Sequence, residues 1–537
     1  MKNNKFFLGL TTLLIPTTTF ASSANTTYKF NNVDLFPLTK EDLAKYDYNP
    51  KEYWVKGTDI VNDFSIEDAQ KFYTNLYETV SKNFVKPISY HDITNKILEG
   101  LSGFVGKISI ETTNNRILIY DKNLKLLGNF KKTSDEDTSN WVNILINIIL
   151  SLRQNNKKMA DAHQEQIYYV STLYLLKSLD ENSSYTDPIS NKEKTKNKNS
   201  TTLGFTYRKT TFGIQVLSIF KDSPIYFTDI KTADIITHIN QIPTRSLTDE
   251  QLEYILTNTD MDILHINYVS YISNKPAEIF IRKNQIIIPS ASSEIKDNIG
   301  IITIHNFKNK SSHEIKNEFD KIKTSNPKGL IIDLRGNVNG ESIEAIETAN
   351  LFINGGEILK TTAQNENENK TYTAKSGDIS NNLPIVIIVN NTTKGTGELF
   401  ASIMEGTNRA VIIGTPTFGS GNIESKYTLS NNSEIKFATH KIFNAKNLSF
   451  DKVGVIPLIC TSNIFDDKDI NTLKQNVKEN KFKDNRPKDN NQTIDLINNI
   501  RNSCKALYPT KGQNDLIIKI ATNIINDSEV YNKLSTK

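Results

Sequence analysis

Two side chains that could together attack a carbonyl group stand in one stretch of the sequence, residues 391–424. Ser420 offers a hydroxyl nucleophile, and Lys394 offers an amine that could serve as its base. A lysine is protonated at neutral pH, so burial must lower its pKa before it can accept the serine proton. Such a pair also needs donors that stabilise the developing oxyanion. One hypothesis is therefore a dyad in which Lys394 and Ser420 face each other.

The elements that must position these residues alternate between strands and helices from residue 298 onward. Apolar runs predict buried strands at 300–304, 330–334, 384–389 and 410–413. Segments with apolar residues at helical spacing predict helices at 312–322, 341–352 and 397–405. This alternation indicates an α/β core with a mostly parallel sheet, in which active sites lie at the carboxyl ends of the strands. Gly395 lies just past one such strand.

The stretch 391–424 resembles the active-site region of the carboxy-terminal processing peptidases, also called tail-specific proteases. In that family a strand leads into a motif like T-A-S-A-S-E, followed by a helix, a second strand and the motif T-F-G-K-G-x-V-Q. Residues 417–421 read T-F-G-S-G, so Ser420 occupies the place of the general-base lysine. The family spacing then places the nucleophilic serine at Gly395. The resemblance implies a protease fold without its two reactive side chains, which we interpret as a pseudoenzyme.

The same resemblance assigns three further positions of the catalytic site. Glu398 matches the family glutamate that follows the nucleophile. Glu424 stands in the place of the glutamine that follows the lysine, and Gly406 in the place of an aspartate implicated in some members. Glycine has no side chain with which to attack a carbonyl, and a serine cannot accept a proton as a neutral lysine does. Glu398 alone cannot supply the missing chemistry.

The loop that should stabilise the oxyanion also departs from the family pattern D-L-R-G-N-G-G-G. Residues 333–337 keep D-L-R-G-N, but Val338 and Asn339 replace the first two glycines of the trio. A β-branched residue is stiff and tolerates a positive φ poorly. Losing one oxyanion donor can cost on the order of 10²–10³ in rate. The expected oxyanion-loop residues are Gly336, Asn337, Val338, Asn339, Gly340 and Thr396.

Residues 199–290 resemble a PDZ domain. Leu203, Gly204 and Phe205 keep most of the G-L-G-F-like loop that binds carboxylates in such domains. Backbone N–H groups of this loop point into a small concavity that holds a C-terminal carboxylate, and glycine lets the backbone approach closely. The resemblance implies that unstructured protein C-terminal tails are the partners. The alternative is a PDZ fold that only packs and binds nothing.

The chain of 537 residues is too long for one hydrophobic core, so we expect a multi-domain α/β protein. The expected parts are a signal peptide, a mostly helical N-terminal domain with a small β insert, the PDZ-like domain, the α/β tail-specific-protease core and a helical C-terminal extension. Their boundaries are placed at 1–24, 25–198, 199–290, 291–465 and 466–537. Residues 178–185, S-L-D-E-N-S-S-Y, resemble the family motif S-L-D-P-H-T-S-Y that precedes the PDZ domain.

The N-terminus has the pattern of a secretory signal. Lys2 and Lys5 precede a short apolar run at 6–15, and small residues follow it. We therefore expect export, to a bacterial periplasm, with no stable membrane span after signal removal; an uncleaved anchor is the alternative. Cys460 and Cys504 are the only cysteines, which suggests one disulfide in an oxidising compartment. Two buried free thiols are the alternative.

Composition narrows the possible partners. The net charge is only +4 and no dense basic stripe is present, which argues against nucleic-acid binding. Neither cysteine has His or acidic neighbours arranged as metal ligands, and no cofactor is expected. Three functions remain open: a pseudoprotease that binds C-terminal tails, a serine endopeptidase with a rearranged site of Ser420 and Lys394, and a structural oligomeric scaffold. Family members often assemble through their helical ends, so a homodimer is a possible assembly.

Overall fold

The computed structural model describes residues 29–30, 33–34 and 64–537. Its gaps are 107, 114, 122–123, 135–136, 181, 189–190, 192–202, 221–222, 248–251, 253–254, 257–262, 284–288, 339, 376, 491–492 and 506–512. The predicted signal peptide and residues 192–202, directly before the PDZ-like loop, lie outside the described residues. Strands β1 (Lys29–Phe30) and β2 (Val33–Asp34) pair with each other.

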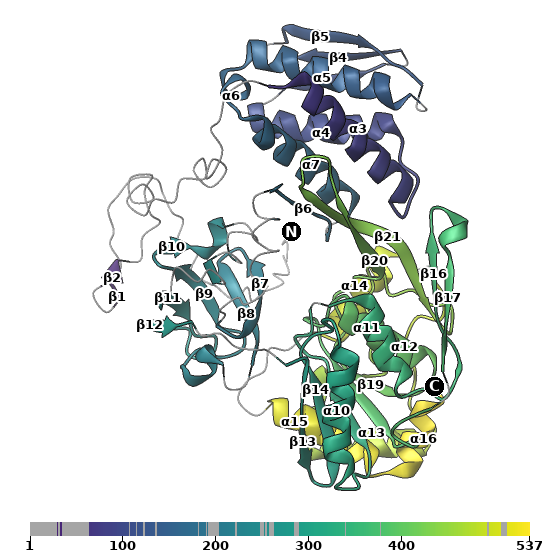
Figure 1. Cartoon of the computed structure of the whole chain (residues 1–537). Coiled ribbons are helices and arrows are strands. Elements are labelled where there is room, and N and C mark those ends of the chain that lie inside the picture. The colour runs from purple at the N-terminus through teal and green to yellow at the C-terminus, as the bar shows by residue number, and fades with distance from the viewer. Residues whose placement is uncertain are drawn as a thin grey trace, which may run out of the picture.

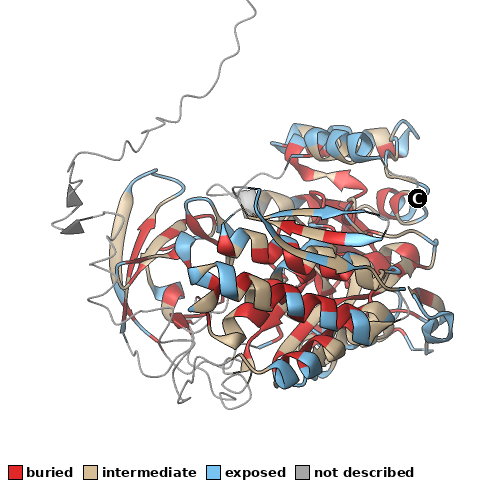
Figure 2. Ribbon diagram, turned by 90° about the horizontal axis from the view of Figure 1, so that it is seen from above, coloured by how far each residue is buried: buried red, intermediate tan, exposed pale blue. Residues whose placement is uncertain are grey.

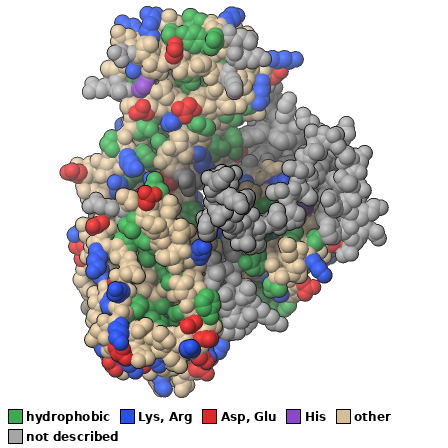
Figure 3. All heavy atoms as spheres, turned by 180° about the vertical axis from the view of Figure 1, so that it is seen from behind, with side chains coloured by type: hydrophobic (Ala, Val, Ile, Leu, Met, Phe, Trp, Pro, Cys, Tyr) green, Lys and Arg blue, Asp and Glu red, His purple; other side chains and the backbone are tan. Residues whose placement is uncertain are grey.

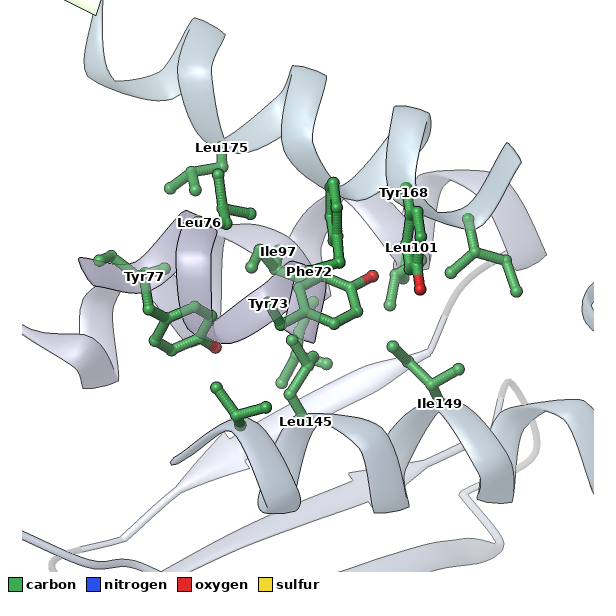
Figure 4. Packing of buried hydrophobic residues seen from close by; sticks show 14 of the residues in the cluster. Phe72, Tyr73, Leu76, Tyr77, Ile97, Leu101, Leu145, Ile149, Tyr168 and Leu175 are labelled. Carbon is green, nitrogen blue, oxygen red and sulfur yellow. The ribbon is translucent and has the colours of Figure 1, made fainter. Parts of the chain in front are cut away.

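A helical region precedes the PDZ-like region (Figure 1). Its helices are α3 (Ile66–Asn83), α4 (Tyr90–Val105), α5 (Thr138–Asn155), α6 (Lys157–Ala160) and α7 (Gln164–Leu179). The antiparallel strands β3 (Ser109–Thr112), β4 (Arg116–Tyr120) and β5 (Leu126–Lys131) form its small sheet. Ser65 and Ser89 cap α3 and α4 by accepting a backbone N–H with their side chains. Inside, Phe72 stacks on Tyr168, with 3.9 Å between ring centroids (Figure 4).

The α/β core confirms the predicted strand–helix alternation. Its six-stranded sheet has the order β13 (Ala291–Lys296), β14 (Ile299–Ile304), β15 (Leu330–Asp333), β18 (Ile385–Val389), β19 (Val411–Gly414) and β22 (Ile459–Cys460). All neighbours pair in parallel except β13, which is an antiparallel edge strand. One face is covered by α10 (Ser311–Lys323), α11 (Ser342–Asn350) and α12 (Thr396–Gly406). Figure 2 shows buried residues in the strands and also along the helices.

The C-terminal helices cover the other face of this sheet. Residues of α13 (Asp467–Lys478), α15 (Gln513–Ile525) and α16 (Ser528–Ser535) share one apolar cluster with sheet residues such as Ile331 and Ile388. Helix α14 (Ile494–Ser503) buries none of its own residues. Cys504, which caps it, forms the predicted disulfide with Cys460 at the end of β22. The disulfide therefore ties a weakly packed helix to the sheet.

A long hairpin connects the α/β core to the helical region. It consists of β20 (Asn422–Thr428) and β21 (Glu434–Asn444), and its sheet also contains β16 (Gly356–Ala363), β17 (Lys370–Ala374) and β6 (Ser184–Thr186). In Figure 1 the hairpin rises toward α7. Leu429, Ile435 and Phe437 near its tip are buried in the same apolar cluster as the helices α3 to α7. The helical region and the core therefore share one hydrophobic core at this point.

The PDZ-like region is a twisted antiparallel sheet. The order is β12 (Pro276–Arg282), β11 (Ile263–Val269), β9 (Ile235–Ile239), β8 (Gly213–Ile219) and β7 (Phe205–Thr210), with β10 (Ile242–Pro243) paired to β9. Short 3₁₀ turns lie at Pro224–Phe227 and Thr244–Ser246. Strand β7 stands at the edge of the sheet, directly after Gly204. An edge strand can accept an extended peptide as an additional strand.

Two expectations from the sequence concern the surface charge and membrane-spanning helices. On the face shown in Figure 3, the described basic and acidic side chains are interspersed rather than gathered into a stripe. Across the described part of the chain, no helix combines the length and apolar character that crossing a bilayer requires.

The joint between the helical region and the hairpin should respond to pH. Glu165 in the first turn of α7 accepts a hydrogen bond of 2.9 Å from Asn431 Nδ2, and burial raises its pKa from 4.5 to about 7. Between pH 4.5 and about 7, Glu165 is deprotonated in the unfolded chain but protonated in the folded protein. The free energy of unfolding therefore falls as pH rises through this range. Glu165→Gln should therefore stabilise the protein, relative to wild type, more above pH 7 than below pH 4.5. Thermal midpoints measured across this range test the expectation.

The matched control is Glu67→Gln on α3, where the side chain is 78% exposed. Its effect on the thermal midpoint should be small, because an exposed ion pair such as Glu67–Lys71 contributes little to stability. A difference between Glu165→Gln and wild type that does not change with pH would contradict the assignment.

Candidate active site

Gly395 lies where the sequence placed it, between the carboxyl end of β18 and the first turn of α12. Its backbone has φ 58° and ψ −108°, a conformation that residues with a side chain rarely adopt. A Cβ built on Gly395 would meet no atom of the described residues within 4 Å. The nucleophile position is therefore open, and glycine leaves it without a reactive group.

Glu398 joins the two loops that carry the nucleophile and base positions. Its side chain is fully buried and accepts hydrogen bonds from the backbone N–H groups of Gly395 (2.9 Å), Gly419 (2.6 Å) and Ser420 (2.8 Å). The hydroxyl of Thr417 donates a fourth bond of 2.5 Å. Burial raises the pKa of Glu398, while these four donors favour its charged form. The glutamate is thus a structural link between the loops.

Ser420 is nearly buried, with 8% of its surface exposed. Its Oγ accepts a hydrogen bond of 3.1 Å from Asn182 Nδ2, a contact that the sequence analysis did not predict. Asn182 occupies the histidine position of the S-L-D-P-H-T-S-Y motif, which is the signal that could have pointed to it. Among the described residues, no hydrogen bond joins Ser420 Oγ to the amine of Lys394. An amide donor on Oγ cannot act as a general base.

Lys394 precedes Gly395 and is half-buried. Its Nζ lies 4.3 Å from the centre of the Phe418 ring, a cation–π contact that favours the protonated amine. Burial lowers the pKa of Lys394 and Lys436 lowers it further, whereas Glu424 and Glu398 raise it. Glu424 itself forms an ion pair of 2.6 Å with Lys436 on the neighbouring strand. Lys394 and Glu424 therefore lie within electrostatic reach of each other near Gly395.

The oxyanion loop is held in place mainly by hydrogen bonds that its backbone groups make with neighbouring residues. Gly336 donates its N–H to Thr392 Oγ1 at 3.1 Å, and the carbonyl of Asn337 accepts the N–H of Lys394 at 2.8 Å. Asn337 is fully buried and donates from Nδ2 to the carbonyl of Ile304. Val338 is half-buried, and Asn339 lies outside the described residues. Thr396 begins α12, and its buried hydroxyl has no hydrogen-bond partner among the residues that the structure describes.

Gly340 and Gly406, two other family positions, both pack closely against neighbouring residues. Gly340 packs against Phe307. Gly406 ends α12, roughly 15 Å along the helix axis from its first residue. A Cβ on Gly406 would lie 2.8 Å from Asn444 Cβ. The structure therefore does not bring Gly406 together with Gly395 and Ser420.

Arg501 of helix α14 is a further residue of this site that sequence reasoning did not find. Its Nη2 donates to the carbonyls of Thr417 (2.9 Å), Phe418 (2.9 Å) and Val453 (3.0 Å). Because Cys504 holds the end of α14 through the disulfide, Arg501 is fixed over the loop that carries Ser420. No local pattern in the sequence predicts this contact.

The PDZ-like loop forms a second candidate site. Leu203 is fully buried, and Gly204 has φ 82°. The carbonyl of Gly204 accepts from the N–H of Phe220 at 2.9 Å and from Ser223 Oγ at 3.1 Å. These bonds fix the turn that leads into Phe205 and the edge strand β7. Ala233 also adopts a positive φ of 77°.

Comparisons with known proteins identify the core. Residues 298–460 match the model of peptidase family S41. The chain therefore carries a peptidase family S41 domain. A carboxy-terminal-processing protease of Bartonella bacilliformis is 28% identical over 296 residues, covering 53% of this chain and 67% of that protein. A probable CtpA-like serine protease of Staphylococcus epidermidis is 26% identical over 241 residues, covering 44% of this chain and 48% of that protein. The resemblance to carboxy-terminal processing peptidases is confirmed.

A solved structure supports the fold independently. The photosystem II D1 C-terminal processing protease matches with a TM-score of 0.50 at 14% identity, covering 73% of this chain and 92% of that chain. At this identity the likeness shows the fold alone. The S41 domain of this chain thus has the family's fold, while its site holds Gly395 and Ser420 at the positions that the resemblance assigned to serine and lysine.

Three features of the described site bear on the chemistry that it can perform. Gly395 offers no nucleophile, and Ser420 has no basic side chain within hydrogen-bond distance among the described residues. In the described part of the chain, no group of three or more His, Cys, Asp or Glu side chains is arranged to hold a metal ion. What remains is an open space beside a helix N-terminus.

Removing the charge of Glu398 should destabilise the S41 domain. In Glu398→Gln, an NH2 group replaces one of the two carboxylate oxygens. This donor then faces N–H groups that had donated to an oxygen acceptor. We expect the free energy of unfolding to fall by about 2–3 kcal/mol, because buried donors left without a partner are costly. Urea unfolding measures this, and the half-buried Glu347→Gln on α11 serves as the control. Equal stability of the two variants would mean that Glu398 does not hold the loops.

Proposed function

We propose that this chain is a non-catalytic member of the carboxy-terminal processing peptidases that binds unstructured protein C-termini. The observation that carries the proposal is Gly395, which has no reactive side chain and at which a Cβ would meet no described atom within 4 Å. The base position, Ser420, accepts an amide donor and has no basic partner among the described residues. Both losses act on the same chemical step, so neither side chain can compensate for the other.

The PDZ-like region supports tail binding. The positive φ of Gly204 and the adjacent edge strand β7 are the two features that carboxylate-terminated peptides use in PDZ domains. Backbone groups of the edge strand would pair with the tail, and the loop at Gly204 would receive its carboxylate. Affinity would then depend on a free C-terminus more than on the sequence of the tail.

Export to a bacterial periplasm belongs to the same proposal. The disulfide between Cys460 and Cys504 fits an oxidising compartment, where such bonds persist. The pattern at 1–24 would direct the chain there.

An active endopeptidase is the second candidate, because burial lowers the pKa of Lys394, whose side chain lies beside the loop that carries Ser420. In that case Lys394 would act as base for Ser420. Two contacts oppose this reading: Lys394 Nζ lies over the Phe418 ring, and Ser420 Oγ is engaged by Asn182. Productive geometry tolerates little misplacement of nucleophile and base.

The purified chain should not cleave an unstructured protein. Incubation with casein, followed by mass spectrometry, should give no new fragments, and the result should be the same for Ser420→Ala. Cleavage that disappears in both Ser420→Ala and Lys394→Ala would establish the rearranged dyad and overturn the proposal. Cleavage that survives both changes would indicate a different nucleophile.

Tail binding should require the loop at Gly204. We expect Gly204→Val to lose affinity for a peptide with a free C-terminus, because valine cannot adopt φ 82° without strain and narrows the carboxylate loop. Isothermal titration calorimetry measures the affinity. Gly356→Val is the matched control, since Gly356 also has a positive φ of 91° but opens onto empty space at the start of β16. Unchanged affinity in Gly204→Val would show that the PDZ-like loop does not bind the tail.

A further inference from the structure

Strand β12 forms the edge of the PDZ-like sheet opposite β7. Among the described residues, β11 is the only strand that pairs with β12, at one end of the strand order. In Figure 1 β12 lies on the side of this region that faces away from the α/β core. An edge strand offers backbone N–H and C=O groups to a further strand unless a proline, a bulge or a covering segment blocks it. Pro276, which has no N–H, stands only at the first position of β12.

The backbone groups of alternate β12 residues point away from the sheet. The N–H of Ser270 donates to the carbonyl of Lys275 at 3.0 Å, directly before β12 begins. Residues of an antiparallel strand alternate between bonding toward their partner strand and away from it. Counted from this bond, the N–H and C=O groups of Glu278, Phe280 and Arg282 point away from β11. No strand, turn or side chain in the described part of the chain bonds to these outward groups.

The side chains beside these groups form a fixed and partly apolar face. Phe280 is 73% exposed, more than any other large hydrophobic side chain in a described strand. Its ring stacks on His265 of β11, with 4.4 Å between centroids, and His265 Nε2 lies 2.9 Å from Glu278 Oε2. Ile263, which is 49% exposed, lies two residues before His265 and therefore on the same face. Phe280 is thus held in position before any partner binds, which reduces the ordering cost of binding.

We propose that β12 pairs in antiparallel fashion with β12 of a second copy of this chain, with Phe280 opposite the partner's Phe280. A two-fold axis then passes between the two phenylalanines, so each contact occurs twice. The outward backbone groups of the two strands exchange hydrogen bonds. The two PDZ-like sheets become one continuous sheet. This pairing does not depend on whether the chain binds C-terminal tails.

The charges on β12 favour a second copy in this register. With the two phenylalanines opposed, Glu278 lies opposite the partner's Arg282, and Arg282 opposite the partner's Glu278. The contacts of Glu278 with His265 and Asn267 both use Oε2, so Oε1 is left to accept from the arginine. Centring the pair one residue earlier or later would instead place Phe280 opposite a charged side chain. The strand is therefore complementary to itself in charge and in apolar surface.

The proposed dimer leaves the tail-binding edge accessible. Strand β7 and the loop at Gly204 stand at the other end of the strand order from β12. Each dimer would therefore present two such loops. Two linked loops would hold a partner that carries two tails more tightly than one loop holds one tail.

Exchanging the charges on β12 tests the pairing. Sedimentation equilibrium of the purified chain between about 1 and 100 µM should show a monomer–dimer equilibrium. Glu278→Arg and Arg282→Glu should each weaken the dimer by about tenfold or more, because each places two pairs of like charges opposite each other. An equimolar mixture of the two variants should regain the wild-type dimer, since both pairs are then again opposite in charge. A role confined to one copy of the chain would not produce this recovery.

Lys370→Glu is the matched control, because Lys370 is an exposed basic residue on β17, the edge strand of another sheet. It should leave the dimer unchanged. A monomer at every concentration, or a dimer that neither charge change weakens, would overturn the proposal. Loss of the dimer in both variants without recovery in the mixture would overturn the register.

A second measurement needs no variant and covers the case in which a charge change prevents folding. Hydrogen exchange of the wild-type amides of Glu278, Phe280 and Arg282 should slow as the protein concentration rises, because the dimer protects them. Exchange rates that do not change with concentration would contradict pairing through β12.

Discussion

The buried carboxylate of Glu398 is the interaction on which the geometry of the S41 site depends. Burying a charge is costly unless donors satisfy it, and Glu398 meets this condition with three backbone N–H groups and one hydroxyl. These donors belong to two loops that follow different strands of the sheet. Neither loop can move without leaving a charged oxygen or a buried N–H unpaired. The positions of Gly395 and Ser420 are therefore coupled by one side chain that takes no part in attack on a carbonyl.

The parallel sheet explains why loops distant in sequence meet at Glu398. β18 lies between β15 and β19, so the loops that follow these three strands emerge side by side. The network then extends beyond the sheet in both directions along the chain. Asn182 reaches Ser420 from the segment after α7, and Arg501 holds the carbonyls of Thr417 and Phe418 from α14. The helical region, the core and the C-terminal helices thus meet at one loop.

The sequence predicted those features of the site that depend on neighbouring residues along the chain. The strand before Gly395 is an apolar run, and the helix after it has apolar residues at helical spacing, so their place in an α/β core was predictable. The disulfide followed from the presence of only two cysteines. The Asn182 and Arg501 contacts and the burial of the hairpin tip among the helices were not predicted. They join residues separated by whole domains, and such contacts leave no periodic signal in the sequence. The Gly406 position was assigned from the family spacing alone, although the predicted helix at 397–405 already placed it at the opposite helix end from Gly395.

Glycine at position 395 and serine at position 420 need not disturb the fold, because the groups that hold the site together are mostly backbone groups. Glu398 binds the N–H of residues 395, 419 and 420, and every residue except proline provides that donor. A change from serine to glycine, or from lysine to serine, leaves these bonds unchanged. Glycine even relieves the strain that a side chain would suffer at φ 58°. The carboxylate has no such substitute, since no backbone group could accept four hydrogen bonds in its place. This difference accounts for a site in which Glu398 matches the protease pattern while the positions that would perform the chemistry do not.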